Sequence, residues 1–438
     1  MDRRTFIQLA VAQLAVGGPA FAQAGKPATQ RGRAAKPAAP PTAAPKSAGT
    51  PWTQWGGPNR NFQTQASGIK DTWPATGPRV MWKRPLGEGY SSTIVEGDVV
   101  YTMYGKPKQE LTLAASAATG QTLWEQSSPM GFNSDAPEMG NGPYSTPLIA
   151  GDRLFTTGVA GRLQCLDKKT GKVLWTQQLW EDHGGSRLMY GYASSPIAFR
   201  DTIIVPVGGR GKAVMAFQQA DGKVAWSRLD FGNVYSSPIL IDVDGLEQLV
   251  VLLDGALVGL NPHNGDQQWQ VPFTADYSIA VATPLWGAGN LLFVSAEYNA
   301  GAKVVELRRN GQQISANELW SSNRLRLHHG NAMRIGDTLY FSSGGKGSQA
   351  ILSAVDARSG KIHWQERSIE KATFVWADNK LITLDQSGAL MIAYPSTTGF
   401  KIAAKAPLLT EIAWTPPVLV GTRLFMRDRR SMIAVDLS

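Results

Sequence analysis

The sequence predicts an all-β fold, an eight-bladed β-propeller of four-stranded antiparallel blades, and three observations lead to it. A glycine turn followed by tryptophan recurs along the chain, a second apolar motif recurs between its copies, and one orphan strand precedes the first copy. Repeats of about 40–50 residues with β-type turns are typical of propellers. The chain has 438 residues, a length that suits an array of units better than one undivided core.

The first motif is a glycine-centred turn followed four residues later by tryptophan. Threonine, asparagine or aspartate before the glycine favours the positive φ of a hairpin turn. The strand that follows presents a large aromatic surface, so we expect these tryptophans to pack between blades. Complete copies span Gly120–Trp124, Gly171–Trp175, Gly222–Trp226, Gly265–Trp269 and Gly360–Trp364. The copy at Gly311 is stretched, with Trp320, and the copy at Gly399 lacks tryptophan.

The second motif is a small residue, often followed by proline, and then an apolar pair. It occurs eight times, out of phase with the first motif, and predicts one strand at the start of each blade. Proline at the first residue of a strand costs no ladder hydrogen bond. The copies begin at Ser92, Thr146, Ser195, Ser237, Thr283, Asn331, Thr373 and Thr415.

The two ends of the repeat predict how the ring closes. The eighth unit stops at residues 433–437, one strand short, whereas residues 80–83 form a tryptophan-bearing strand without a unit of its own. If this N-terminal strand completes the last blade, no sheet edge stays exposed. Seven tryptophans then occupy one equivalent site, namely Trp82, Trp124, Trp175, Trp226, Trp269, Trp320 and Trp364.

The first 22 residues have the three parts of a secretory signal. Arg3 and Arg4 precede an apolar run over residues 9–16, and Ala20 and Ala22 form a small-x-small cleavage site. The arginine pair resembles a twin-arginine export signal. No other stretch has the length of a transmembrane helix, and no cysteine stands at the cleavage site for a lipid anchor. We therefore expect a periplasmic or otherwise exported bacterial protein.

Composition separates a basic linker from a nearly balanced body. Residues 23–50 are rich in Ala, Pro and Lys and predict a disordered spacer, so the propeller is expected over residues 51–438. The net charge is +9, but seven cations and one acid lie before residue 51, which leaves +3 for the body. A nucleic-acid-binding body needs a basic stripe, so nucleic acid is not an expected partner.

The repeat resembles the tryptophan-docking repeat of the PQQ-binding-like β-propellers. The resemblance rests on units such as residues 166–175, and residues 52–60 are similar to the opening of exported bacterial members. It implies two functions. One is a quinoprotein dehydrogenase of alcohols or sugars that holds PQQ and calcium in the central funnel. The other is the outer-membrane assembly lipoprotein, a scaffold that binds a protein partner.

This chain departs from both branches. With Cys165 as its single cysteine, it cannot form the adjacent-cysteine disulfide of the dehydrogenases. It has no Cys-x-x-Cys-His haem motif, no aspartate that matches their catalytic position, and no lipid-anchoring cysteine. We therefore expect a periplasmic binding or scaffold module with no assigned cofactor, and a PQQ- and calcium-dependent dehydrogenase is the alternative. The oligomeric state stays open.

The residues just before each innermost strand are the candidate ligand site, because ligands of ring folds bind in the central funnel. They suggest either a mouth that binds a protein or small-molecule ligand, or hydroxyls that satisfy buried backbone groups. These candidates are Tyr90, Tyr144, Tyr192, Tyr235, His329 and Trp414. Glu297 and Asn299 are added, because carboxylate and amide oxygens are ligand types that calcium uses.

Three further motifs have simpler structural interpretations. His328 and His329 would point to opposite faces of a strand, so no metal site is expected. Residues 181–183 hold a carboxylate pair and a histidine that could do acid–base work, but a solvated loop explains them. The glycine-rich stretches 208–211 and 344–347 precede no helical pattern and predict hairpin turns rather than phosphate loops.

Overall fold

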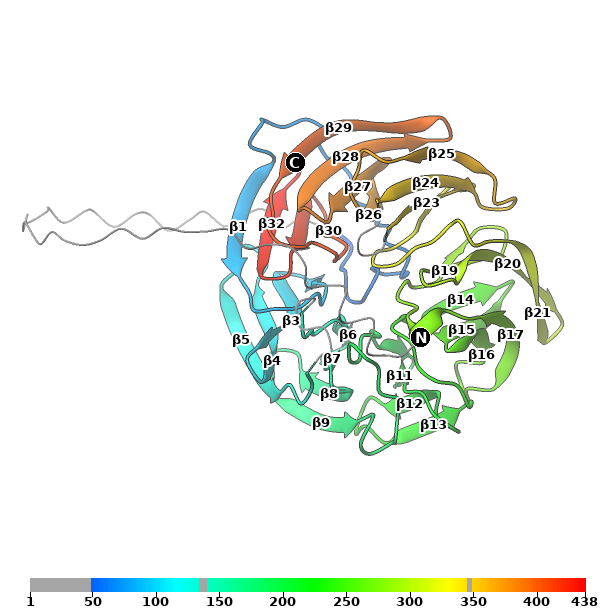
Figure 1. Cartoon of the computed structure of the whole chain (residues 1–438). Helices are drawn as coiled ribbons and strands as arrows, with labels where there is room; N and C mark the ends of the chain where they lie inside the picture. The colour runs from blue at the N-terminus through cyan, green and yellow to red at the C-terminus, as the bar shows by residue number, and fades with distance from the viewer. Residues whose placement is uncertain (1–48, 134–139, 345–348) are drawn as a thin grey trace, which may run out of the picture. The chain divides into compact units, whose positions relative to one another are not determined.

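The computed structural model describes residues 49–133, 140–344 and 349–438, and it confirms the predicted all-β propeller. Eight four-stranded antiparallel sheets follow one another around a ring (Figure 1). The chain divides into two compact units, Met1–Pro45 and Lys46–Ser438, and all described residues belong to the second. The predicted export signal lies outside the described residues, as does the predicted linker up to residue 48. None of the described helices is long and apolar enough to cross a membrane.

Blades 1 to 4 are meanders whose strands run in order from the channel outwards. Blade 1 contains β2 (Ile94–Glu96), β3 (Val99–Lys106), β4 (Gln109–Ser116) and β5 (Thr122–Pro129). Blade 2 contains β6 (Leu148–Ala150), β7 (Arg153–Thr157), β8 (Arg162–Asp167) and β9 (Val173–Gln178). Blade 3 contains β10 (Ile197–Phe199), β11 (Thr202–Pro206), β12 (Val214–Gln218) and β13 (Val224–Arg228). Blade 4 contains β14 (Ile239–Val243), β15 (Leu246–Leu253), β16 (Gly255–Leu260) and β17 (Gln267–Phe273).

Blades 5 to 7 repeat this order, and blade 8 takes its outermost strand from the start of the propeller. Blade 5 follows the short η3 (Asp276–Ser278) and contains β18 (Leu285–Gly287), β19 (Leu291–Ala296), β20 (Gly301–Asn310) and β21 (Gln313–Ser322). Blade 6 contains β22 (Met333–Ile335), β23 (Thr338–Ser343), β24 (Ile351–Asp356) and β25 (Ile362–Glu366). Blade 7 contains β26 (Ala372–Ala377), β27 (Lys380–Asp385), β28 (Ala389–Ser396) and β29 (Gly399–Pro407). Blade 8 contains β30 (Val418–Val420), β31 (Arg423–Arg427), β32 (Ser431–Asp436) and β1 (Arg79–Pro85).

The place of a strand within its blade explains its residue pattern. Every residue of β16 after the first is buried, because neighbouring blades cover both faces of a middle strand and favour a continuous apolar run. The outermost β5 has a single fully buried residue, and its exposed positions are interspersed with partly buried ones. The blade therefore grades from an apolar interior to a polar outer edge.

The ring closes through the N-terminal strand, as the sequence predicts. β1 pairs with β32 in antiparallel register from Arg79↔Asp436 to Pro85↔Ser431, and the pair lies side by side in Figure 1. Arg427 strengthens the seam, because its buried guanidinium donates to carbonyl oxygens of Gly89, Ser91 and Met103 in and before blade 1. The closing contacts thus join the first and last parts of the propeller.

The repeated tryptophans pack between blades, which confirms their predicted role. A Cβ atom at Gly171 would lie 2.4 Å from the Trp124 ring of the preceding blade, and the φ of this glycine is +72°. Only glycine suits both conditions. The indole N–H of Trp124 also donates to the carbonyl oxygen of Lys168 at 3.2 Å. Equivalent bonds to the next blade are made by Trp82, Trp175, Trp320 and Trp364.

The docking is incomplete around blade 5. In the described part of the chain, the indole N–H group of Trp269, which precedes blade 5, is buried without a hydrogen-bond partner, and no atom lies within 4 Å of a Cβ built on Gly311. The cause is the long hairpin of blade 5, whose β20 and β21 have ten residues each. Because the hairpin is long, its turn at Gly311 does not pack against Trp269. The stretched motif copy therefore marks an irregularity of the ring.

Residues 52–64, called the cap below, cross the central channel and bond to blades 1 to 7. The end of the channel at which the innermost strands begin is called the funnel mouth. The opposite end, at which these strands finish, is called the capped end. The cap bonds join Trp52 to Val95, Thr53 to Ile149, Arg60 to Pro196 and Pro238, Trp55 to Thr283, Gln63 to Arg334, and Thr64 to Trp376. The sequence motif in this segment therefore has a structural role that sequence reasoning did not assign.

Arg60 is the buried polar centre of the cap, with an exposed fraction of 4%. Its guanidinium donates to the carbonyl oxygen of Pro238 at 2.7 Å and to that of Pro196, and its Nε donates to Gln54 at 3.0 Å. Burial lowers the pKa of Arg60 to about 9, because desolvation disfavours the charged form. The guanidinium ties the cap to the backbones of blades 3 and 4.

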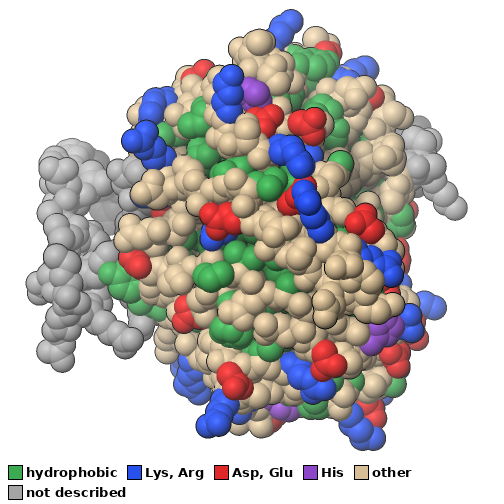
Figure 2. Space-filling view, turned by 90° about the vertical axis from the view of Figure 1, so that its right-hand side faces the viewer, with side chains coloured by type: hydrophobic (Ala, Val, Ile, Leu, Met, Phe, Trp, Pro, Cys, Tyr) green, Lys and Arg blue, Asp and Glu red, His purple; other side chains and the backbone are tan. Residues whose placement is uncertain are grey.

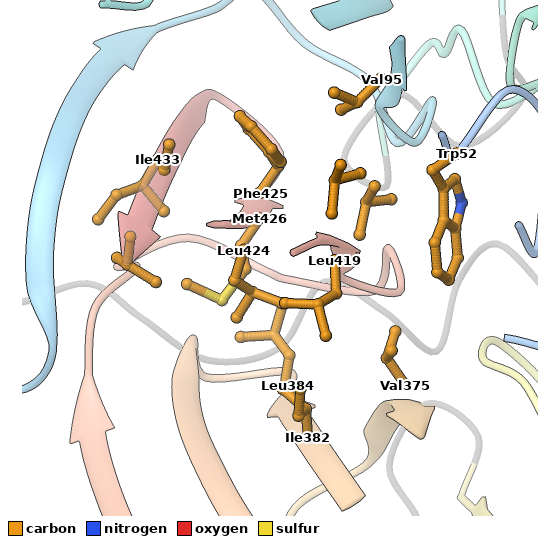
Figure 3. Close-up of a cluster of buried hydrophobic side chains, with 14 of the residues drawn as sticks. Trp52, Val95, Val375, Ile382, Leu384, Leu419, Leu424, Phe425, Met426 and Ile433 are labelled. Atoms are coloured by element: carbon orange, nitrogen blue, oxygen red, sulfur yellow. The ribbon is translucent and has the colours of Figure 1, made fainter. Parts of the chain in front are cut away.

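Trp52 anchors the cap in the hydrophobic core. Its side chain is 1% exposed and belongs to the same buried cluster as Val95, Val375 and Leu419 (Figure 3). These neighbours come from blades 1, 7 and 8, on the side of the channel away from the backbone carbonyls that Arg60 binds. Burial of a whole indole is a large stabilising contribution, so the cap is part of the propeller core.

The outer side of the propeller carries charges of both signs. In Figure 2, the lysine and arginine side chains are interspersed with aspartate and glutamate, and neither sign gathers on this side. Ion pairs such as Lys303–Glu318 at 2.7 Å and Arg228–Asp266 at 3.3 Å bring opposite charges together. This distribution fits the small net charge of residues 51–438.

Candidate ligand site at the funnel mouth

One equivalent sequence position in every blade lies at the funnel mouth. It lies four residues before the first residue of the innermost strand; Tyr144, for example, precedes Leu148, the first residue of β6. In blade 7, where β26 begins early, Lys371 lies four residues before Val375, which pairs with the third residue of β27 just as Leu148 pairs with the third residue of β7. In blade order the residues at this position are Tyr90, Tyr144, Ala193, Tyr235, Val281, His329, Lys371 and Trp414.

Aromatic rings from four of these positions form a continuous stack. The ring centroids of Tyr144 and Tyr90 lie 6.2 Å apart with planes 6° from parallel, and those of Tyr90 and Trp414 lie 5.2 Å apart. Trp414 stacks in turn on His329 at 4.3 Å and 9°. Blades 6, 8, 1 and 2 thus share one aromatic wall, which the sequence could only suggest as separate candidates.

Lys371 of blade 7 completes this wall. Its side chain is buried, and Nζ lies 4.6 Å from the ring centroid of Trp414 and 3.5 Å from Nδ1 of His329. Burial lowers the pKa of Lys371 to about 8, although the charge of Glu297 acts in the opposite direction. Among the described residues Lys371 forms no ion pair. An ammonium group held in this way is costly, which makes it a candidate functional group.

The two histidines beside Lys371 are held neutral. Burial lowers the pKa of His328 to about 3 and that of His329 well below its usual value, and the charge of Lys371 adds to both effects. Their rings lie 3.8 Å apart, so the expectation of opposite faces was wrong: both residues precede β22 and do not lie on a strand. No cluster of three or more metal-ligating side chains occurs in the three described segments.

The wall on blades 3 to 5 is apolar. Its buried residues are Leu188, Tyr235 and Ile279, with Tyr190, Ala193, Val281 and Tyr298 packed against them. Met189 and Tyr277 flank this cluster in the chain and are 44% and 63% exposed. Exposed methionine and tyrosine beside a packed apolar cluster are typical of protein interfaces. The mouth therefore has one aromatic, cationic side and one apolar side.

Tyr192 lies one residue before the mouth position, which Ala193 occupies. The offset turns its side chain inward, because successive residues of an extended chain face opposite sides. Tyr192 is fully buried, and its hydroxyl donates to the carbonyl oxygen of Pro206 at 2.9 Å. The ring of Tyr190 instead lies 6.0 Å from that of Tyr235 at the mouth.

Glu297 and Asn299 lie in the turn between β19 and β20, and each is bound by a different residue. Oε1 of Glu297 is 3.4 Å from Nη1 of Arg326. The side-chain amide of Asn299 donates to Oδ2 of Asp276 at 2.6 Å. Glu297 therefore lies near enough to Lys371 to act on its pKa, whereas the amide of Asn299 is bound to Asp276.

These residues do not fit the calcium–PQQ pair that the resemblance implies. Calcium takes about six to eight oxygen ligands, but the Glu297 carboxylate lies beside Arg326 and feels the charge of Lys371. A planar quinone would need an open aromatic face, and Trp414 already stacks with Tyr90 and His329. Among the described residues, the mouth places the buried ammonium group of Lys371 beside the Glu297 carboxylate rather than a set of oxygen ligands for calcium.

Sequence reasoning missed Lys371, Tyr190 and Tyr298 as residues of the mouth. Lys371 was detectable, because it lies two residues before the seventh copy of the apolar motif at Thr373, just as His329 lies two residues before the sixth copy at Asn331. Counting this offset would also have separated Tyr192 from the other tyrosines. Tyr298 contacts the ring of His328 at 5.2 Å through a turn of another strand pair, and no repeat in the sequence signals that contact.

Comparisons with known proteins find relatives of the same fold. Residues 193–405 match the family described as Outer membrane protein assembly factor BamB. The protein of that name from Burkholderia pseudomallei (strain K96243) is 23% identical over 295 residues, which cover 67% of this chain and 73% of the relative.

Two solved structures extend the likeness to nearly the whole propeller. Quinohemoprotein alcohol dehydrogenase from Comamonas testosteroni has a TM-score of 0.64 at 12% identity, covering 89% of this chain and 80% of its own. BamB from Moraxella catarrhalis has a TM-score of 0.55 at 14% identity, covering 81% and 97%. At these identities the likeness shows the fold alone.

Proposed function

Because this chain is a PQQ-like β-propeller, we propose that it is an exported scaffold protein whose funnel mouth binds a protein partner. The observation that carries this proposal is Lys371, a buried ammonium group without an ion pair in the described structure, set in an aromatic wall. The relative described as an outer membrane protein assembly factor supports a scaffold role.

The two sides of the mouth define the chemistry of the partner. Lys371 favours a carboxylate, because an incoming anion supplies the charge partner that the propeller itself does not provide. The apolar side, with exposed Met189 and Tyr277, favours a hydrophobic side chain a short distance away. The proposed partner segment is therefore an acidic peptide that also carries an aromatic or aliphatic residue.

Binding of short peptides to the full-length protein tests this proposal. Acidic peptides with one aromatic residue should bind more tightly than basic peptides of the same length and apolar content. Lys371→Met should weaken the acidic peptide about tenfold or more, because one partner of a desolvated charge pair is lost. Trp286→Ala, at the capped end, is the matched control. Equal affinity for acidic and basic peptides, or unchanged binding by Lys371→Met, would refute the proposal.

Export is tested separately with the first 50 residues. Fused to a reporter, residues 1–50 should direct it to the periplasm of a bacterial host, and replacing Arg3 and Arg4 by lysine should retain the precursor in the cytoplasm. A reporter that reaches the periplasm equally well with both lysines contradicts the twin-arginine route and leaves the peptide-binding result unaffected.

The dehydrogenase alternative makes an opposite prediction. A quinoprotein would show an absorbance shift on addition of PQQ and calcium, followed by dye reduction with an alcohol or a sugar. We expect neither, because the Glu297 carboxylate lies beside Arg326 and Asn299 is bound to Asp276. A saturable shift with turnover would replace the scaffold proposal.

A further inference from the structure

Two pockets open at the capped end of the channel, on either side of cap residues 58–61. The first has a volume of ≈610 Å³ and lies between the cap and blades 3 to 5. The second has a volume of ≈430 Å³ and lies between the cap and blade 7. Pro58, Asn59 and Asn61 line both pockets, so the two share a wall. Volumes of this size suit small-molecule ligands.

Each pocket contains one partly buried tryptophan from an innermost strand. Trp286 of β18 pairs with Leu292, Trp376 of β26 pairs with Leu381, and each is second from the end of its ladder. In blades 1, 2 and 8 the equivalent residues share the core cluster of Trp52. Those residues are Val95, Ile149 and Leu419. Blades 5 and 7 therefore place indoles in the pockets at the position where blades 1, 2 and 8 place aliphatic core residues.

Several polar groups of the pockets have hydrogen-bond capacity to spare. In the described structure the exposed side chain of Asn59 makes no hydrogen bond, and the indole N–H groups of Trp286 and Trp376 make none. The hydroxyl of Thr64, in the second pocket, is buried without a partner. Amide groups both donate and accept, as do the hydroxyls of a sugar.

The charged groups of the pockets are already engaged. Arg60 lines the first pocket, but its guanidinium donates to backbone carbonyl oxygens. Asp242 accepts the N–H of Gly245 at 2.7 Å, and Asp378 pairs with Lys380 at 2.9 Å. A neutral ligand therefore suits this end of the channel, in contrast to the anionic ligand proposed for the mouth.

We propose that the two pockets form one binding site for a neutral oligosaccharide that lies across cap residues 58–61. Trp286 and Trp376 present apolar indole faces to the C–H faces of two sugar rings, and the amides of Asn59 and Asn61 bond to hydroxyl groups between them. A chain of sugars fits better than a single sugar, because one indole lies on each side of the shared wall.

Calorimetric titration of the full-length protein with cellotetraose, chitotetraose and maltotetraose tests this site. At least one of these neutral tetrasaccharides should bind. Trp286→Ala and Trp376→Ala should each raise its Kd about tenfold or more, since each removes one stacking face, and Asn59→Ala should have a smaller effect. An anionic oligogalacturonate of the same length should bind more weakly.

Trp414→Ala is the matched control, because it removes an aromatic ring near the axis at the opposite end, and its Kd for the tetrasaccharide should not change. Trp286→Phe keeps a ring in the core and should retain part of the affinity, which separates loss of stacking from unfolding. The proposal is overturned if none of the three neutral probes binds at millimolar concentration, or if Trp286→Ala and Trp376→Ala bind like the parent. Peptide binding at the mouth is measured on the same variants, so the two proposals fail independently.

Discussion

The two ends of the central channel are built from the same eight strands and differ in what fills them. At the capped end, the chain's own residues 52–64 supply a buried tryptophan and a buried arginine, and the arginine is satisfied by backbone carbonyls of blades 3 and 4. At the mouth, the rings of Tyr90, Trp414 and His329 stack on one another around Lys371, which has no ion pair among the described residues.

This difference separates polar groups that hold the fold from polar groups that, under the proposed function, are available to a ligand. Arg60 and Lys371 are both buried cations, but only the first has its hydrogen bonds completed by protein. Buried polar groups are normally satisfied, so a cation without an ion pair is the more informative of the two. Substitutions at the two ends should therefore affect different properties, stability at the cap and binding at the mouth.

Removal of the central indole of the cap should have the largest effect. Trp52→Ala empties a fully buried site and should lower the free energy of unfolding by about 3–5 kcal/mol. Trp414→Ala removes a partly buried ring at the mouth and should cost less than about 1.5 kcal/mol. Urea denaturation of both variants measures the contrast, and equal losses would contradict the division between a structural and a ligand-binding end.

Removal of the cap guanidinium should come next. Arg60→Ala leaves the carbonyl oxygens of Pro196 and Pro238 buried without donors and should destabilise the protein by about 2–4 kcal/mol. Arg60→Lys should recover only part of this loss, because an ammonium group cannot reproduce the guanidinium fork. Thermal unfolding of the three proteins checks the order, and a lysine variant as stable as the parent would disprove the bridging role.

Crowding a tryptophan at a blade interface should have the next largest effect on stability. Gly171→Ala forces a side chain with positive φ against Trp124 and should cost about 2 kcal/mol. Gly311→Ala is the matched control, because Gly311 also has a positive φ, +62°, but no atom lies within 4 Å of a Cβ there. A smaller loss for Gly311→Ala, measured by urea denaturation, isolates the contribution of tryptophan docking.

The smallest effect should be the pH dependence contributed by Lys371. Its pKa is lowered to about 8 by burial, so between about pH 8 and the ordinary lysine pKa near 10.4 the unfolded chain binds more protons than the folded one, and stability from this group rises with pH. Lys371→Met should therefore be more stable than the parent at pH 7, and this advantage should shrink by pH 10. An advantage that does not change with pH would contradict the lowered pKa.

The fold was predictable because it is local and repeated. Gly171 and Trp175 stand at a spacing that recurs in five blades, so turn chemistry and aromatic burial act in the same way at every complete copy. Even the irregular blade 5 was visible as the stretched copy at Gly311. Ring closure by the strand around Trp82 followed from counting strands at the two ends, because an unpaired edge is unfavourable.

The site was predictable only where it follows the repeat. Tyr90, Tyr144, Tyr235, His329 and Trp414 share one offset from their strands, and the structure joins four of these rings in one continuous stack, in the order Tyr144, Tyr90, Trp414 and His329. Tyr192 differs by one residue, which is enough to bury it. Lys371 follows the offset but was not recognised, because a lysine before a strand is common and the sequence does not show which side chains surround it in the fold.

Taken alone, the order of residues determined the number of blades, the turns between their strands, and the strand that seals the ring, since each depends on contacts between adjacent units. Only the tertiary structure decided that residues 52–64 cross the channel, that Lys371 lies against Trp414, and that Trp286 and Trp376 flank a shared wall. The cap joins blades that are far apart in the chain, and a repeat motif specifies how neighbouring blades pack without specifying which side chains meet at their common axis.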